Sequence, residues 1–342
     1  MKAVGRYRPA PIEDPASLVD LDLPDPVPQG RDLLVQVEAV SVNPADTKRR
    51  RTTPAAADDS PLVLGWDAAG TVLETGPEAS LFKPGDRVFY AGAANRPGCN
   101  SARHLVDERL VGPMPRNLGF AEAAAMPLTA LTAWEMLFDR FQIPQHGGAG
   151  GAGGTGTAGG TLLVVGGAGG VGSMAIQIAR QLTGLTVVAT ASRPETRQWC
   201  LDLGAHAVLD HSRPLAGQIG DVPYAFITTA IDQHLPVIDQ VLAPQGHVGL
   251  IEVPKPFEMR PLMQKSTALH WELMFTRSLF GTADMIRQHE ILTAISGLVE
   301  AGRLRTTLTE VVGPIDAATL RRTHARIEAG RARGKLVLEG WG

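Results

Sequence analysis

The chain has 342 residues, of which 44% are apolar and 20% charged, and its formal net charge is −3. This size predicts two domains with full cores, and charges spread along the chain argue against a nucleic-acid-binding surface. The two cysteines, Cys99 and Cys200, argue against a disulfide-stapled secreted scaffold. No signal-peptide pattern and no membrane-length apolar stretch are present. We therefore expect a cytoplasmic protein without membrane or nucleic-acid partners.

The first third of the chain has the pattern of short strands separated by turns. Apolar and polar residues partly alternate over residues 33–40, and further strands are expected at 62–65 and 69–73. A Pro-Gly turn within 82–89 leads into another strand. We expect residues 49–60 to form a loop. Whether this loop also acts as a lid is not decided by the sequence. These features predict a β-rich domain over residues 1–125.

From residue 120 onward, helices appear first, and strands then alternate with helices. A stretch of almost only Gly, Ala and Thr at 146–160 is expected to be a flexible insertion. The βαβ rhythm after it predicts a parallel, doubly wound sheet, so the fold class is α/β with a Rossmann domain. The expected helices are 120–126, 128–141, 171–182, 194–203, 235–242 and 316–330, with a further one starting near 291; the strands are 161–165, 185–191, 206–210, 224–229, 247–252, 308–312 and 335–339.

One glycine-rich loop stands where a dinucleotide-binding loop should stand. It matches G-x-G-x-x-G, follows the expected strand 161–165 and opens an apolar-periodic helix, so its N–H groups would meet a pyrophosphate. Residues 151–156 match the same pattern but have neither flank. A tight turn without a ligand is the alternative for the first loop. Its residues are Gly167, Ala168, Gly169, Gly170, Val171 and Gly172.

The end of the next strand indicates which cofactor is bound. NAD enzymes usually carry Asp or Glu there, but this strand ends in Ser192 and Arg193, and no carboxylate occurs before Glu195. A hydroxyl and a guanidinium suit a 2′-phosphate, and Arg197 lies one turn further on. NADPH is therefore favoured over NADH. The alternative is that both arginines are merely exposed.

At this point the chain resembles the medium-chain dehydrogenase/reductase family over nearly its whole length. The loop form 168–172 is typical of the quinone oxidoreductase branch, and residues 192–196 and 269–272 are similar to its zinc-type alcohol dehydrogenase-like group. The resemblance implies a GroES-like catalytic domain made of residues 1–125 and 295–342, an NADP-binding Rossmann domain over 126–294, and a homodimer. The other matching segments are 41–48, 64–70, 82–88, 128–134 and 334–338.

The zinc ligands of this family are missing from the matching positions. Alcohol dehydrogenases hold catalytic zinc with Cys, His and a further Cys or Glu. The resemblance places Asn43 at the first cysteine position and Trp66 at the histidine position, and no cysteine lies near 128–134. The structural zinc lobe needs four cysteines, and its region has only Cys99. No zinc is therefore expected.

Without zinc as a Lewis acid, acceptors whose reduced anion is delocalised are the easier substrates. The sequence therefore predicts a zinc-independent NADPH-dependent reductase of quinones or α,β-unsaturated carbonyls. Two alternatives stay open: a zinc-dependent alcohol dehydrogenase with atypical ligands, and a non-catalytic NADPH-binding protein. The resemblance implies Asn43, Asp46 and Thr132 as catalytic candidates, Trp66 and Tyr90 as substrate-pocket candidates, and Lys335 as a cofactor-phosphate ligand.

Five of these candidates have a structural alternative, and Trp66 would be only a packing residue. Asn43 and Pro44 would form only a turn, and Asp46 would only cap a helix. Thr132 would bond to its own helix backbone, and Lys335 would be solvated.

Overall fold

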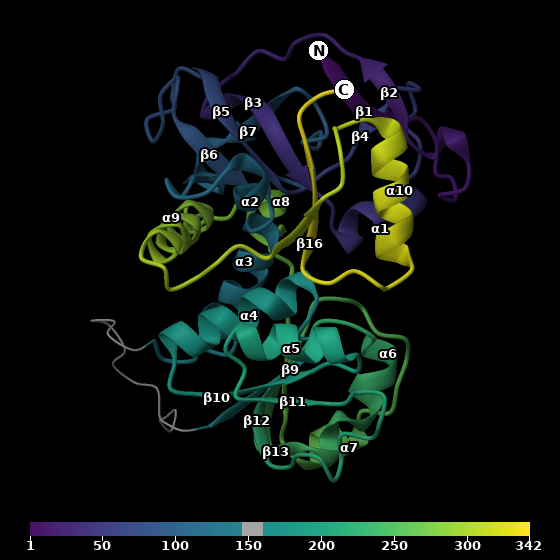
Figure 1. Cartoon of the computed structure of the whole chain (residues 1–342), viewed down its shortest axis with the longest axis vertical. Coiled ribbons are helices and arrows are strands. Elements are labelled where there is room, and N and C mark those ends of the chain that lie inside the picture. The colour runs from purple at the N-terminus through teal and green to yellow at the C-terminus, as the bar shows by residue number, and fades with distance from the viewer. Residues whose placement is uncertain (146–159) are drawn as a thin grey trace. The chain divides into compact units, whose positions relative to one another are not determined.

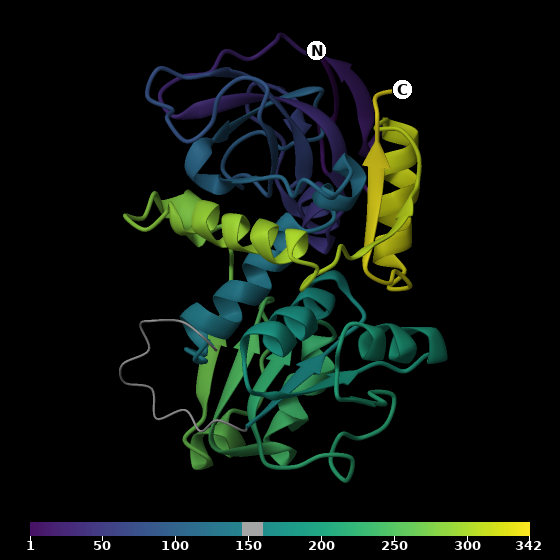
Figure 2. The same ribbon diagram turned by 60° about the vertical axis from the view of Figure 1, so that its left-hand side comes forward.

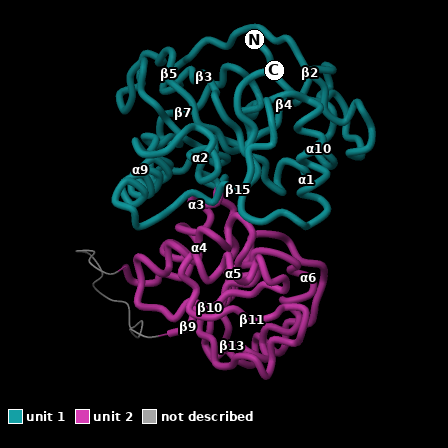
Figure 3. The backbone as a smooth tube through the Cα atoms, viewed as in Figure 1, with its two compact units in different colours: residues 1–128, 275–342 teal, residues 129–274 magenta. Residues whose placement is uncertain are grey.

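The computed structural model describes residues 1–145 and 160–342, which form two compact units (Figure 3). Unit 1 contains residues 1–128 and 275–342, and unit 2 contains residues 129–274. Unit 2 is one continuous stretch of chain, whereas unit 1 is assembled from two. The sequence analysis placed the corresponding boundaries near residues 125 and 295.

Unit 1 is built around a seven-stranded sheet in which β3 is the central strand. The strand order is β15-β16-β3-β5-β6-β8, and β7 also pairs with β3. A smaller sheet has the order β2-β1-β4. The strands are β1 (Lys2–Arg6), β2 (Val19–Asp22), β3 (Asp32–Ser41), β4 (Leu62–Val63), β5 (Ala68–Thr75), β6 (Arg87–Tyr90), β7 (Arg103–Asp107), β8 (Val111–Pro113), β15 (Leu308–Val311) and β16 (Lys335–Glu339).

The helices of unit 1 cover its sheets. Helix α10 lies beside α1 and the closing strand β16 (Figures 1 and 2). Strand β16 pairs antiparallel with β3, with Val337 opposite Ser41, so the C-terminal segment reaches the end of β3 from which α1 begins. The helices are α1 (Pro44–Thr52), α2 (Phe120–Ala124), α8 (Thr276–Phe280), α9 (Arg287–Glu300) and α10 (Ala317–Glu328).

Unit 2 is a parallel six-stranded sheet with the order β11-β10-β9-β12-β13-β14. Its inner strands are buried, as expected when helices cover a parallel sheet. The strands are β9 (Thr161–Val165), β10 (Thr186–Thr190), β11 (Ala207–Leu209), β12 (Val222–Ile227), β13 (Leu242–Leu250) and β14 (Ala268–Trp271); the helices are α3 (Pro127–Trp134, which begins in unit 1), a π-helix (Glu135–Arg140), α4 (Gly170–Leu182), α5 (Pro194–Asp202), α6 (Ile231–His234), a 3₁₀ helix (Leu235–Gln240) and α7 (Arg260–Gln264).

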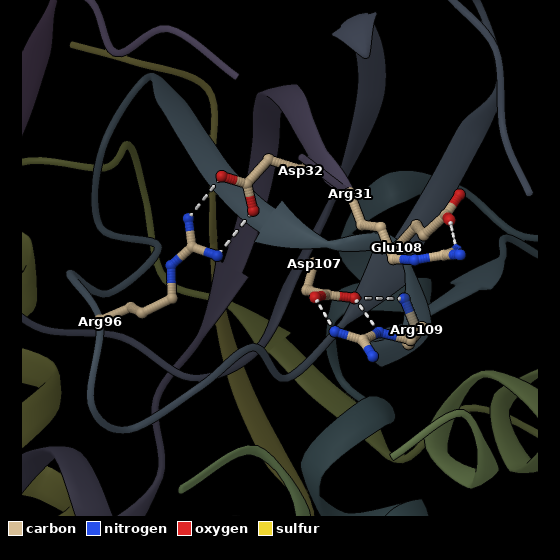
Figure 4. A network of polar contacts seen from close by, with 6 residues as sticks. All are labelled: Arg31, Asp32, Arg96, Asp107, Glu108 and Arg109. Atoms are coloured by element: carbon tan, nitrogen blue, oxygen red, sulfur yellow. Dashed lines mark hydrogen bonds and ion pairs between the residues drawn. The ribbon is translucent and has the colours of Figure 1, made fainter. Parts of the chain in front are cut away.

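A polar network supports the far end of β3 (Figure 4). The Glu108 carboxylate is fully buried and accepts the backbone N–H groups of Ser80 and Leu81 at 2.7 and 2.6 Å. Arg31 Nη1 donates to the same carboxylate at 2.7 Å. Because buried N–H groups without partners are costly, this carboxylate fixes the loop that leads into β6. The network contains none of the candidate site residues, and its contacts are structural.

The expected fold class is confirmed: unit 2 has a parallel Rossmann-like sheet, and unit 1 is β-rich. The expectation of a loop at 49–60 is wrong for its first residues, because α1 continues to Thr52. The expected helix 235–242 is a 3₁₀ helix to Gln240, preceded by α6. Of the expected insertion at 146–160, residues 146–159 lie outside the described residues. No described helix has both the length and the apolarity to cross a membrane.

Candidate active site

A buried polar cluster in unit 1 joins three segments that are far apart in the sequence. Asn43 directly precedes α1, Asp67 directly precedes β5, and Lys335 is the first residue of β16. All three side chains are at most 3% exposed. The antiparallel pairing of β16 with β3 brings Lys335 to the start of α1. This pairing explains why residues 43 and 335 meet.

The Asn43 amide has no free donor left. Its Nδ2 donates to the Trp66 carbonyl at 3.1 Å and to Asp67 Oδ2 at 2.9 Å, and its Oδ1 accepts from Lys335 Nζ. An asparagine amide has two N–H donors, and both are used here. The contacts therefore favour a positioning role for Asn43 over direct hydrogen bonding to a substrate.

Asp46 lies in the first turn of α1 and is 1% exposed. Its Oδ2 accepts the backbone N–H of Asn43 at 2.5 Å, so the helix-capping alternative describes a contact that exists. Burial raises the pKa of the Asp46 carboxyl to about 7, against the lowering effects of the Asn43 N–H, Lys335 and Arg49; Asp67 raises it further. This carboxyl therefore gains and loses its proton near neutral pH.

The two substrate-pocket candidates are both buried in unit 1. Trp66 is 1% exposed, and its Nε1 donates to the Ala93 carbonyl at 3.2 Å. The Tyr90 hydroxyl lies 3.1 Å from His104 Nδ1, and His104 Nε2 lies 3.0 Å from the Pro97 carbonyl. Because a carbonyl only accepts, Nε2 carries the proton and the Tyr90 hydroxyl donates to Nδ1.

This hydrogen-bond chain ties up the Tyr90 proton. Burial lowers the pKa of His104 to about 4, so the imidazole is neutral and its Nδ1 accepts at neutral pH. Burial also raises the pKa of Tyr90 well above its ordinary value. The contacts therefore leave Tyr90 without a free donor, and its role in a substrate pocket stays a prediction.

Thr132 and Lys335 complete the candidates outside the glycine loop. Thr132 lies in α3, in unit 2, and is 5% exposed; its assignment as a catalytic candidate stays a prediction. Lys335 is 3% exposed, so the alternative of a solvated lysine is wrong. Its ammonium group contacts Asn43 and Asp67, and its assignment to a cofactor phosphate stays a prediction.

In unit 2, the glycine loop has the shape of an anion cradle. It connects β9 to α4, whose N-cap is Gly169. A Cβ on Gly172 would lie 2.4 Å from the Gly166 carbonyl oxygen, and one on Gly167 would lie 2.7 Å from Ala189 Cβ. A Cβ on Gly169 would meet nothing closer than 3.5 Å. Two glycines thus serve packing, while the third faces open space at a helix N-terminus, which fits a phosphate group.

The residues that follow β10 differ in how freely they can meet a ligand. Ser192 is exposed, and Arg193 Nε pairs with Glu195 Oε1 at 3.0 Å, with both side chains over 40% exposed. Arg197 Nη2 instead donates to the Val208 carbonyl at 2.8 Å and Nη1 to the Ala191 carbonyl at 3.4 Å. Arg193 can exchange its weak surface partner for a phosphate, whereas Arg197 supports the strand ends.

His211 is a further candidate beside the glycine loop that the sequence analysis did not name. It follows β11, and its Nδ1 lies 2.9 Å from Thr190 Oγ1, which accepts the Gly166 N–H at 3.0 Å. The carboxyl ends of neighbouring parallel strands meet at one edge, so the order β11-β10-β9 places this histidine beside the loop. Burial lowers its pKa, which Asp210 partly offsets. The only signal in the sequence was a polar residue two positions after a strand, without any motif.

The donor groups at the family's zinc position do not fit zinc. Trp66 has no lone pair to offer, and Asn43 Oδ1 and Asp67 Oδ2 both accept from Lys335. Cys99 is 1% exposed, and burial raises the pKa of its thiol well above the ordinary value. In residues 1–145 and 160–342, no three His, Cys, Asp or Glu side chains form a group that could hold a metal ion.

Comparison with known proteins identifies the family. Residues 29–135 match the alcohol dehydrogenase GroES-like domain, and residues 203–338 match the zinc-binding dehydrogenase domain. A zinc-type alcohol dehydrogenase-like protein of Staphylococcus aureus is 38% identical over 99% of both chains. The tomato 2-methylene-furan-3-one reductase is 30% identical over 90% of this chain and 71% of its own. Mouse quinone oxidoreductase is 28% identical over 93% and 92%.

Solved structures agree with these matches. A Rhizobium etli structure described as a zinc-dependent alcohol dehydrogenase protein is 53% identical, with a TM-score of 0.94 over 100% of this chain and 98% of its own. A mycobacterial protein complexed with NADPH is 25% identical, with a TM-score of 0.79 over 99% of both chains. Fold and matches together define an oxidoreductase. The chain belongs to the medium-chain dehydrogenase/reductase family, in its zinc-type alcohol dehydrogenase-like group.

Proposed function

We propose that this protein is a zinc-independent, NADPH-dependent reductase of quinones or α,β-unsaturated carbonyls. The observation that carries the proposal is the donor chemistry of the buried cluster, where an ammonium group bonds to the asparagine and the carboxylate at the family's zinc position. A site without a Lewis acid favours acceptors whose anions are delocalised. The names of the mouse and tomato relatives belong to such reductases, and this agreement supports the proposal.

The cofactor supplies the hydride when bound, and residues of this chain bind and orient it. The glycine loop 167–172 meets the pyrophosphate with backbone N–H groups at the N-terminus of α4, where Gly169 leaves room for close approach. Ser192 and Arg193 would bind the 2′-phosphate, which would compete with Glu195 for the Arg193 guanidinium. The NADPH-complexed mycobacterial relative supports the choice of cofactor.

The proton that completes the reduction is assigned to Asp46. Its buried carboxyl has a pKa of about 7, so it holds a proton in the acidic half of the neutral range. Asn43 orients it through the backbone N–H that meets Oδ2. Thr132, Trp66 and Tyr90 are kept as pocket candidates. We also propose a homodimer, because β14 ends the parallel sheet with an open edge where Trp271 is 49% exposed.

The first experiment measures NADPH oxidation with a simple quinone by chelator-treated protein. We expect turnover that added zinc does not change and that is much slower with NADH. Activity that appears only after zinc is added would instead support an alcohol dehydrogenase with atypical ligands. Tight NADPH binding without reduction of quinones or enones would support a non-catalytic NADPH-binding protein.

Replacing Asp46 by asparagine tests the proton assignment. The substituted amide oxygen still accepts the Asn43 N–H, so the cap is preserved. We expect kcat at pH 6 to fall about tenfold, less than a typical general acid contributes, because a delocalised anion can also take its proton from water. Wild-type kcat should decline as the pH rises through about 7, and this decline should vanish in the variant.

The same substitution has a consequence for stability that needs no substrate. The pKa of Asp46 is higher in the folded chain than the ordinary 3.8, so the folded state holds a proton that the unfolded state releases between about pH 4 and 7. Wild-type stability should therefore decrease across that window relative to Asp46→Asn in thermal unfolding. The control is Asp58→Asn, which changes an exposed carboxyl. Parallel curves for wild type and Asp46→Asn would contradict the assignment.

A further inference from the structure

The carboxylate of Asp67 is surrounded by hydrogen-bond donors. Its Oδ1 accepts the Leu128 backbone N–H at 2.7 Å, and its Oδ2 accepts from Asn43 Nδ2 at 2.9 Å and from Lys335 Nζ at 2.8 Å. Asp67 is 0% exposed. Burial raises the pKa of the Asp67 carboxyl, and Lys335, the Leu128 N–H and Asn43 act against that rise. With three donors on its two oxygens, we interpret Asp67 as a carboxylate that forms a charged pair with Lys335.

The pair connects four pieces of unit 1. Asp67 reaches the start of α3 through Leu128, and Lys335 reaches the residue before α1 through Asn43 Oδ1. Asn43 in turn holds Asp46 through its backbone N–H. A buried ion pair adds little net stability, but removing one partner leaves an unpaired buried charge. Such a pair is therefore better explained by the geometry that it fixes than by stability.

We propose that Lys335 and Asp67 form a buried positioning pair that holds Asn43, and with it the first turn of α1 that carries Asp46, in the arrangement used for reduction. Lys335 acts inside this cluster rather than on a cofactor phosphate. The inference rests on the proposed function only in giving Asp46 a catalytic use. The geometric part concerns the protein alone and can be tested without any substrate.

The two members of the pair have opposite effects on the pKa of Asp46. Lys335 of β16 and Arg49 of α1 lower the pKa of Asp46, and Asp67 raises it. The buried thiol of Cys99 also lies within electrostatic reach. Removing Lys335 should therefore raise the pKa of Asp46, and removing the charge of Asp67 should lower it, each by about one unit as expected for charges this close.

The experiment is a carbon-13 NMR titration of the Asp46 carboxyl in the full-length protein, assigned with Asp46→Asn. The single variants are Lys335→Met, Lys335→Arg and Asp67→Asn. The double variant combines Lys335→Met with Asp67→Asn. We expect opposite pKa shifts for Lys335→Met and Asp67→Asn, and recovery towards the wild-type value in Lys335→Arg. The double variant, which leaves no unpaired charge, should unfold at a higher temperature than either charge-removing single variant.

NADPH affinity of the same variants separates the two roles of Lys335. We expect Lys335→Met to bind NADPH within about twofold of wild type. A tenfold weaker affinity would assign Lys335 to the cofactor and overturn the proposal.

The NMR titration can also overturn the proposal. It does so if Lys335→Met and Asp67→Asn shift the Asp46 pKa in the same direction, or if neither shifts it. If a single variant does not fold, the comparison of Lys335→Arg with the double variant provides the same test: the Asp46 pKa must stay near wild type in Lys335→Arg. Absence of quinone turnover in wild type would remove the proposed function without touching these outcomes.

Discussion

Alanine at Gly172 is expected to weaken NADPH binding severely, whereas alanine at Gly169 should leave the fold intact. A Cβ on Gly172 would lie 2.4 Å from the Gly166 carbonyl oxygen and 2.8 Å from Gly167 Cα, so the loop must move. Such overpacking costs about 1–3 kcal/mol, and the displaced N–H groups no longer converge on one anion. We expect the unfolding temperature to fall by about 1–4 °C and NADPH affinity to fall by at least about a hundredfold.

Gly169→Ala is the matched control because its new methyl group meets no atom closer than 3.5 Å. The φ angle of Gly169 is −74°, so alanine adopts this backbone without strain. We expect the ligand-free protein to unfold as wild type does, while NADPH binds about tenfold more weakly because the methyl group occupies its approach. Fluorescence titration and thermal unfolding measure both. Normal NADPH binding by Gly172→Ala would remove the loop from the cofactor site.

Loss of the Arg193 guanidinium is expected to remove most of the preference for NADPH. Charge-assisted hydrogen bonds are worth about 1.5–3 kcal/mol, which corresponds to a rise of about ten- to a hundredfold in the Kd of NADPH. NADH lacks the 2′-phosphate, so its affinity for Arg193→Ala should be unchanged. The exposed ion pair with Glu195 at 3.0 Å is a weak competitor, and its loss should barely affect stability.

The control for this prediction is Arg213→Ala, which removes another exposed arginine paired with an aspartate. It should change the affinity of neither cofactor. Titration of both variants with NADPH and NADH gives four dissociation constants to compare. Equal weakening of NADPH and NADH by Arg193→Ala would show that this side chain does not recognise the 2′-phosphate.

Local patterns were sufficient to predict the Rossmann half of the fold. The strand 161–165 and the helix after Gly169 are short-range features, so flanking residues predicted a strand-to-helix loop at 167–172. The matching pattern at 151–156 lies outside the described residues. Helix α1 was missed although its start carries Asn43 at the N-cap, Pro44 in the first turn and Asp46 three residues after the cap. The sequence analysis noted these residues as a turn and a cap and gave too little weight to their combination.

The arrangement of the buried cluster could not be predicted in the same way. Asn43 and Lys335 were identified separately, but their contact depends on the pairing of β16 with β3. The hydrogen bond between Tyr90 and His104 depends likewise on tertiary structure. The two residues lie on β6 and β7, which are not neighbouring strands of the sheet. Residue type suggests what a side chain can do, but only the fold shows which donors are already in use.

The two-piece composition of unit 1 has a consequence for synthesis on the ribosome. Unit 2 is one continuous segment and has its own core, so it can fold as soon as residues 129–274 have emerged. The buried cluster of unit 1 can form only after Lys335 has been synthesised, because Asn43 and Lys335 are 292 positions apart. Until β16 emerges, Asp67 lacks its counter-ion and one side of β3 lacks a strand. The nascent chain therefore completes its Rossmann-like unit early and the buried cluster of unit 1 last.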